Sequence, residues 1–183
     1  ISMNNKDFEI LDKAIRRVKD FPKPGILFYD ITGILRVPSA FKYCIDRMCE
    51  IYSSAGIDAV AGIESRGFIF AAPLAERLGI PMILIRKKGK LPGKKYSCSY
   101  ALEYGTAEIE AHVDDIEKGS RILLVDDLIA TGGTLNAAVN LMEQGGAVVT
   151  DVFGVIGLPF LNYEKTLGPK IKVKTLVNYN SES

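Results

Sequence analysis

Apolar residues recur along the chain in two patterns, one typical of helices and the other of buried strands. Helical spacing of apolar positions marks Phe8–Val18 and Phe41–Tyr52. Helices are also predicted over Phe68–Leu78, ended by Gly79, and from the TGGT segment to about Gln144. Short apolar runs of strand length separate or follow these helices, at Ala59–Ile63, Met82–Ile85, Ile122–Val125, Ala147–Ile156 and Ile171–Val177.

Strands that alternate with helices predict an α/β fold with a doubly wound, mostly parallel central sheet and flanking helices. Two segments depart from this alternation. In Phe21–Ile31, three residues prevent a regular helix: Pro22, Pro24 and Gly25. Arg86–Tyr104 is polar at first and then alternating, which predicts a long loop or hairpin outside the sheet.

Composition narrows the class of protein. The chain has 183 residues, 48% hydrophobic and 25% charged, which predicts one globular domain over residues 3–183. Ile1 and Ser2 precede Met3 and are expected to be a cloning remnant. A net charge of +1 gives no field for binding nucleic acid, and no apolar run approaches the roughly 20 residues of a membrane span.

Cysteine and histidine usage bears on compartment and metal chemistry. Three cysteines, Cys44, Cys49 and Cys98, form no CxxC spacing, so we expect reduced thiols in a cytoplasmic protein. The single His112 cannot build a histidine-rich metal centre.

Charged or glycine-rich segments follow three of the predicted strands. They are Glu64–Gly67, the basic stretch RKKGKLPGKK from Arg86, and DDLIATGGT from Asp126. Because ligands of open α/β sheets bind beyond the carboxyl ends of the strands, these segments are expected to converge on one crevice.

The ATGGT segment has the chemistry of a phosphate cradle. Gly132 and Gly133 let backbone amides approach an anion closely, and Thr131 and Thr134 add hydroxyl donors at a helix start. The segment contains no lysine and does not match the P-loop pattern, so it suits one terminal monophosphate. For TGGT alone, a tight strand-to-helix turn is an equally good interpretation.

Two carboxylates, Asp126 and Asp127, directly precede this cradle. Ionised carboxylates only accept hydrogen bonds, so they suit the hydroxyls of a diol. A ribose 5-phosphate has both groups, an anionic end and 2′ and 3′ hydroxyls. The acids and the phosphate loop are therefore predicted to hold two parts of one ligand.

The stretch Ile122–Thr134 (ILLVDDLIATGGT) resembles the phosphoribosyl pyrophosphate motif of the type I phosphoribosyltransferases. FPKPGILFYDI, GIESRGFIFAAPLA, IRKKGKLPG and SYALEYGTAEIE stand in the order found in the adenine phosphoribosyltransferases, from about Phe21 to Val177. The resemblance implies transfer of ribose 5-phosphate from 5-phosphoribosyl 1-pyrophosphate (PRPP) to N9 of adenine, giving AMP and pyrophosphate. It also implies a homodimer, and Mg²⁺ held mainly by PRPP and pyrophosphate.

The resemblance assigns roles to individual residues. Ribose-phosphate binding falls to Asp126, Asp127, Ala130, Thr131, Gly132, Gly133 and Thr134. Pyrophosphate binding falls to Ser65, Arg66, Lys87 and Lys90, with Arg86 serving a neighbouring subunit, and the Glu64–Ser65 peptide bond is expected to be strained. Without the resemblance, Glu64–Gly67 is an ordinary turn and the basic run is a solvated face.

Two mobile or irregular segments complete the implied site. A lid at about residues 86–105 carries Glu103, the candidate acid or base near N7 of the purine, with Tyr104 closing the loop. A hood at about residues 20–35 stacks Phe28 on adenine and reads its edge through Leu27 and Tyr29, while Leu158 packs on the other face. Without the resemblance, these are solvated strand residues and a packed apolar loop.

Two positions depart from the family pattern. Tyr29 stands where relatives often carry arginine, and Gly157 where some carry glutamate; both bear on base selectivity. The alternatives are therefore the same chemistry on hypoxanthine, guanine or xanthine, or a regulator that binds PRPP without catalysis. A lid rich in charged residues favours an enzyme over a regulator.

Overall fold

A seven-stranded sheet in the order β5-β6-β4-β3-β7-β8-β9 organises the protein in the computed structural model, which describes residues 5–181. The strands are β3 (Ala59–Ile63), β4 (Met82–Lys87), β5 (Lys95–Ala101), β6 (Thr106–His112), β7 (Arg121–Ile129), β8 (Val148–Gly157) and β9 (Lys172–Asn178). In the part of the sheet ordered β4-β3-β7-β8-β9, each strand is parallel to the next. Strand β6 is antiparallel to both of its neighbours, β4 and β5. The predicted α/β fold with a mostly parallel sheet is confirmed. Ile1 and Ser2 lie outside the described residues.

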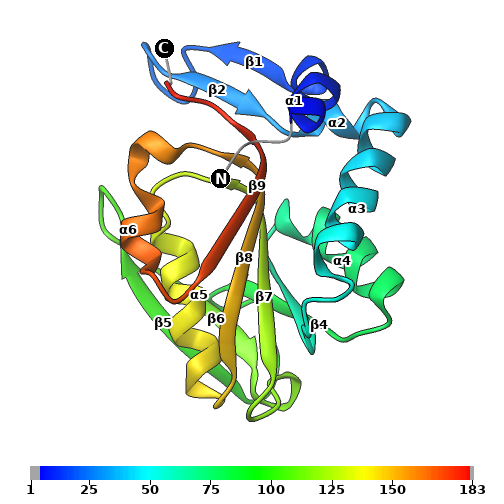
Figure 1. The fold of residues 1–183 in the computed structure, drawn as a ribbon. Helices are drawn as coiled ribbons and strands as arrows, with labels where there is room; N and C mark the ends of the chain where they lie inside the picture. Colours follow the sequence, from blue (N-terminus) through cyan, green and yellow to red (C-terminus); the bar gives the residue numbers. More distant parts are fainter. Residues whose placement is uncertain (1–4, 182–183) are drawn as a thin grey trace.

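Helices cover both faces of the sheet (Figure 1). They are α3 (Pro38–Tyr52) and α4 (Gly67–Leu78) on one face and α5 (Gly133–Gln144) on the other, as predicted from their apolar spacing. Shorter elements are α1 (Asn5–Leu11), η1 (Asp12–Ala14), α2 (Thr32–Leu35), η2 (Val113–Asp115), η3 (Pro159–Leu161) and α6 (Tyr163–Leu167). Within the described range, no helix combines the length and the apolar character that crossing a membrane requires.

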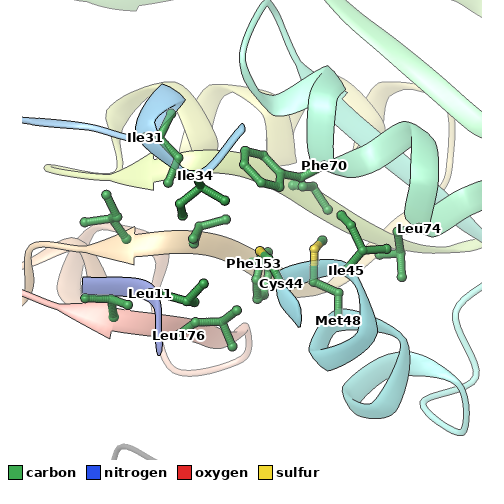
Figure 2. Close-up of a cluster of buried hydrophobic side chains, with 14 of the residues drawn as sticks. Leu11, Ile31, Ile34, Cys44, Ile45, Met48, Phe70, Leu74, Phe153 and Leu176 are labelled. Carbon is green, nitrogen blue, oxygen red and sulfur yellow. The ribbon is translucent and has the colours of Figure 1, made fainter. Parts of the chain in front are cut away.

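The pleat of β7 divides the core into two clusters. Leu123 and Val125 pack with residues of α3 and α4, and Figure 2 shows part of this cluster around Phe153 and Phe70. Ile122 and Leu124 point to the other face and pack with α5. Because successive strand residues face opposite sides, a strand buried on both faces is apolar at every position. That accounts for the continuous apolar runs in the sequence.

The N-terminal region contains one wrong prediction. The helix expected over Phe8–Val18 ends at Leu11, and Arg16–Lys19 forms β1, which pairs with β2 (Leu27–Asp30). Val18 is paired with Phe28 in this separate two-stranded sheet. Strand pairing supplies backbone hydrogen bonds that override the helical spacing of the apolar residues. In the hood segment, about residues 20–35, the chain forms β2 and α2, and β1 lies directly before it.

A second correction concerns the segment after β4. Residues expected to form a loop or hairpin outside the sheet include β5, which pairs with β6, and β6 pairs with the end of β4. The hairpin therefore extends the sheet at its edge. Its alternating residues Tyr96, Cys98 and Tyr100 pack against the buried cluster that contains α5. Burial of this apolar face stabilises the hairpin as part of the sheet.

Candidate active site

The strands β3 and β7 lie side by side at the point where the chain direction across the sheet reverses. From β3 the chain passes through α4 to β4, and from β7 it passes through α5 to β8 on the opposite face. The two helix starts therefore diverge, which leaves a crevice beyond the strand ends. The start of α4 lies close to β7, and only a glycine fits there, because a Cβ on Gly67 would lie 2.7 Å from the carbonyl oxygen of Val125.

A cavity of about 370 Å³ occupies this crevice. It brings together eight residues predicted from the sequence: Phe28, Tyr29, Ser65, Arg66, Lys87, Asp126, Asp127 and Thr134. Four lining residues received no predicted role: Ile63, Glu64, Tyr100 and Leu128. A larger cavity of about 820 Å³ lies beside the starts of β8 and β9, and it contains none of the predicted site residues.

The phosphate-cradle segment surrounds a small hollow of about 100 Å³ next to this cavity. Asp126 and residues 128–135 line the hollow. Gly132 has a φ of 85° and immediately precedes α5, so the helix begins at Gly133 with its amides directed at the hollow. The backbone at Gly132 also packs against Tyr163 of α6, since a Cβ there would lie 3.2 Å from the Tyr163 Cβ. Glycine is therefore required for both conformation and space.

The two aspartates lie inside β7, which continues to Ile129 rather than ending at Val125 as predicted. Asp127 is only 6% exposed and accepts a hydrogen bond from Arg66 Nε at 2.6 Å. Burial, and next the charge of Asp127, raises the pKa of Asp126 well above its ordinary value. The Asp126 carboxyl accepts a hydrogen bond from the Asp127 N–H at 2.8 Å. Asp126 therefore holds its proton more tightly than a solvated aspartic acid does.

Glu64 anchors the segment that follows β3. Its carboxylate accepts a hydrogen bond from the Lys87 N–H at 2.8 Å and lies 3.4 Å from Arg86 Nε. Burial acts to raise the pKa of Glu64, but the Lys87 amide and Arg86 outweigh it and lower the pKa overall. The Glu64–Ser65 peptide bond is cis. Glu64 could have been singled out because it is the first residue beyond a buried strand.

Two residues at the tip of the lid, Glu103 and Tyr104, lie apart from the cavity lining, whereas Lys87 and Tyr100 of the lid belong to it. The Glu103 and Tyr104 side chains sit at the tip of the β5–β6 hairpin, 72% and 78% exposed. Lys23 of the hood reaches both, with its Nζ 3.5 Å from Glu103 Oε2 and 5.5 Å from the centre of the Tyr104 ring. Arg86 and Lys90 also lie outside the residues that line the cavity.

The hood supplies an aromatic wall. The Arg66 guanidinium lies 5.9 Å from the centre of the Phe28 ring, so the residue that holds Asp127 also contacts the hood. Leu27 and Leu158 do not line the cavity, and Leu158 is buried beside it in the core. At Gly157 a Cβ would lie 2.5 Å from Asn178 Oδ1 and 2.7 Å from Thr175 Cγ2. These neighbours fill the space that a side chain would need.

Comparisons with known proteins agree with this geometry. Residues 31–154 match the family model described as the phosphoribosyl transferase domain. The adenine phosphoribosyltransferase of Treponema denticola is 64% identical over 95% of this chain and 91% of its own length. The crystal structure of the Thermoanaerobacter pseudethanolicus adenine phosphoribosyltransferase superposes with a TM-score of 0.90 at 41% identity, over 94% of this chain and 99% of that one.

A third comparison adds ligands. The Trypanosoma brucei adenine phosphoribosyl transferase, solved in complex with AMP, pyrophosphate and ribose 5-phosphate, superposes with a TM-score of 0.89 at 26% identity, covering 100% of this chain and 85% of that one. Fold, motif order and overall similarity lead to the same conclusion. The chain belongs to the adenine phosphoribosyltransferases, within the phosphoribosyl transferase family.

Proposed function

We propose that the crevice between the ends of β3 and β7 is the active site in which this chain forms AMP and pyrophosphate from adenine and PRPP. One observation carries the assignment: Asp127, paired with Arg66, stands directly beside the phosphate cradle at the start of α5. Diol acceptors next to an anion site match ribose 5-phosphate, the part shared by PRPP and AMP.

In the proposed reaction, the bond from ribose C1′ to the pyrophosphate oxygen breaks and pyrophosphate leaves with the electron pair. Adenine N9 forms the new bond to C1′ and loses its proton. The hollow from Ala130 to Thr134 holds the 5′-phosphate, and Asp126 and Asp127 hold the ribose hydroxyls. These contacts fix the sugar, so the base meets C1′ in a productive orientation, which is a large part of the rate enhancement.

Pyrophosphate is assigned to the Ser65–Arg66 turn together with Lys87 and Lys90, and Arg86 is assigned to a neighbouring subunit's site in a homodimer. Glu103 manages the base's proton once the lid tip moves from solvent toward the purine, with Tyr104 beside it. Phe28 stacks on the base, Leu27 and Tyr29 read its edge through their backbone groups, and Leu158 supports the opposite face. The exposure of the lid tip and the Phe28 wall of the cavity support this arrangement.

Mg²⁺ fits this site as an ion carried by the substrate. The described residues hold no group of three or more histidine, cysteine or carboxylate side chains able to bind a metal. Mg²⁺ commonly binds through substrate phosphates and keeps several waters, so PRPP and pyrophosphate supply its ligands. When bound, the ion neutralises phosphate charge. A cytoplasmic location is likewise proposed, supported by the three free thiols.

The test is a panel of purine bases offered with PRPP and Mg²⁺ and scored for nucleotide formation. Sites that hydrogen-bond a specific edge discriminate by about 10⁴ or more, so adenine should be used and hypoxanthine, guanine and xanthine largely rejected. Comparable kcat/KM for adenine and hypoxanthine would move the assignment to another purine. Binding of PRPP without any nucleotide formation would identify a regulator.

A further inference from the structure

Side chains from the N-terminal and C-terminal parts of the chain meet where the hood joins the body of the protein. Asp12 comes from η1, Arg17 from β1, Tyr29 from β2, and Tyr179 from the segment after β9. Figure 1 shows this C-terminal segment running up from β9 to lie beside β1 and β2. We call these four residues the hood clamp.

The two tyrosines form the centre of the hood clamp. Their rings are stacked with centroids 3.9 Å apart and planes 1° from parallel, and the residues are 7% and 8% exposed. The Arg17 guanidinium lies 5.8 Å from the centre of the Tyr29 ring and 5.1 Å from that of Tyr179. A cation over a buried aromatic pair adds attraction to the packing of the rings.

Polar contacts fix the edges of the stack. The Tyr179 hydroxyl donates to Asp12 Oδ1 at 2.6 Å, and Asp12 also pairs with Arg17. The Tyr29 hydroxyl donates to the carbonyl oxygen of Ser181 at 2.8 Å. Burial, followed by the adjacent Asp12, raises the pKa of Tyr179, so the neutral hydroxyl is the form that donates. Each ring is thus held in its plane by a hydrogen bond to a separate segment.

The hood needs such an attachment because its two strands form a sheet of their own, separate from the seven-stranded sheet. An isolated two-stranded hairpin is marginally stable in water. Tyr29 is the next residue after Phe28, and adjacent strand residues point to opposite faces. The hood clamp therefore holds the face of β2 that carries the Tyr29 side chain, while Phe28 lies near Arg66 at the cavity.

We propose that Tyr179 is a positioning residue for the purine base, because its stack on Tyr29 fixes the β2 backbone and Phe28 over the base site. This inference rests on the proposed function, in which the hood reads the base. It adds to the base site two residues near the C-terminus, Tyr179 and Ser181, which contact Tyr29 of the hood.

The experiment compares Tyr179→Ala and Tyr179→Phe with the full-length parent. For Tyr179→Ala, KM for adenine should rise about tenfold or more and the preference for adenine over hypoxanthine should fall, because small misplacements of a positioning group have large effects. Direct binding of PRPP without base should stay at the parental value. Tyr179→Phe keeps the ring stack, so KM for adenine should stay within about threefold of the parent.

Tyr52→Ala is the matched control, since Tyr52 is a buried tyrosine that packs edge-on against Phe153 in the same core cluster, away from the hood. It should lower the melting temperature without raising KM for adenine. Equal effects of Tyr52→Ala and Tyr179→Ala on KM for adenine would show that Tyr179 contributes only to the packing of the core. That result would overturn the proposal.

Amide hydrogen exchange over Leu27–Asp30 gives a readout that does not depend on turnover. Exchange there should accelerate in Tyr179→Ala and not in Tyr52→Ala. If the parent forms no AMP, the proposed function fails; if the parent forms AMP but Tyr179→Ala leaves β2 exchange and the adenine preference unchanged, the hood clamp alone fails.

Discussion

The ribose-phosphate side of the crevice and the tip of the lid hairpin are held in place by different means. Asp127 is buried, paired with Arg66 and carried on a central strand of the sheet. Glu103 stands at the tip of an edge hairpin, largely exposed, and reaches Lys23 through an ion pair of two exposed side chains. Buried, hydrogen-bonded groups open rarely, whereas exposed loop tips move at little cost.

The difference matches the two demands of the proposed reaction. The ribose 5-phosphate is common to substrate and product, so its site can remain rigid through the cycle. The base and pyrophosphate must enter and leave in each cycle, so the groups that act on them belong on a segment that can open and close. The predictions below separate these two regions.

The largest effect is expected at the lid tip. Glu103→Gln keeps the shape but removes the acid or base, so kcat should fall by about 10²–10⁴ while AMP binding stays near the parental value. Steady-state kinetics and AMP titrations measure the two effects. Glu108→Gln, on the same hairpin and paired with Lys88, is the control and should keep its kcat. Full turnover in Glu103→Gln would show that Glu103 is a solvated residue with no catalytic role.

On the rigid side, Asp127→Asn removes the charge that pairs with Arg66 and an acceptor for the ribose hydroxyls. PRPP and AMP should both bind roughly 10–100-fold more weakly, since hydrogen bonds to charged groups contribute ~1.5–3 kcal/mol. Calorimetric titration of each ligand provides the measurement. Asp58→Asn, which alters the acceptor of the Arg121 N–H at the opposite end of β7, should leave both affinities unchanged. Normal AMP binding by Asp127→Asn contradicts the diol assignment.

The basic segment at the end of β4 should act on pyrophosphate alone. Lys87→Ala and Lys90→Ala are each expected to weaken PRPP and pyrophosphate binding by about tenfold, since each loses a charge-assisted contact, and to leave AMP binding nearly intact. Lys88→Ala is the control from the same segment, because Lys88 is paired with Glu108. Equal losses for AMP and pyrophosphate would show that these lysines hold the wrong part of the ligand.

Burial of the aspartate pair also predicts a dependence of stability on pH. Burial first, and then the charge of Asp127, raises the pKa of Asp126 in the folded state. Such an acid stabilises the folded state below its unfolded pKa of 3.8 and loses that contribution as the pH rises toward the folded pKa. Asp126→Asn removes this loss, so the variant should have a higher melting temperature than the parent at pH 7. The increase should be about 2–4 °C for each kcal/mol gained in the free energy of unfolding.

The gap in melting temperature should narrow as the pH is lowered toward 4, which scanning calorimetry from pH 4 to 8 can follow. A gap independent of pH would mean that the substitution acts through packing rather than through the proton on Asp126.

The smallest effect is expected where hood and lid touch. Lys23→Ala removes the contacts to Glu103 and Tyr104, and exposed ion pairs contribute ~0.2–1 kcal/mol, so KM for adenine should change by about two- to fivefold with an unchanged melting temperature. Lys42→Ala, which removes an exposed pair with Asp46 on α3, is the control. A larger effect at low salt than at high salt is expected for the first variant only.

Local sequence patterns predicted the parts of this molecule that depend on neighbouring residues. The apolar run of β7 and the glycines at the start of α5 carry their information within a dozen residues, and both lie where the sequence placed them. Six of the eight predicted residues that line one cavity follow from a simple rule, that parallel strands present their carboxyl ends at one edge. The other two, Phe28 and Tyr29, lie on the separate hairpin and were predicted only through the family resemblance.

Features that depend on distant pairing could not be predicted in the same way. Val18 continued a helical pattern but pairs with Phe28, and β6 joins the sheet through only two paired positions with β4. The role of Glu64 depends on Arg86 and the Lys87 amide, more than twenty residues away. Competition between local preference and long-range pairing decides such cases, and a single sequence does not report its outcome.

The hydrogen bond from Tyr29 to Ser181 also has a consequence for biosynthesis. Its two residues are 152 positions apart, so the contact forms only after the strands of the central sheet have been made. During translation, β3, β7 and α5 all emerge before Ser181, so the N-terminal hairpin waits for this partner until after the central strands have been made. Contacts of such high sequence separation form late and slowly. We therefore expect a nascent chain to bind the sugar phosphate before it can select a base.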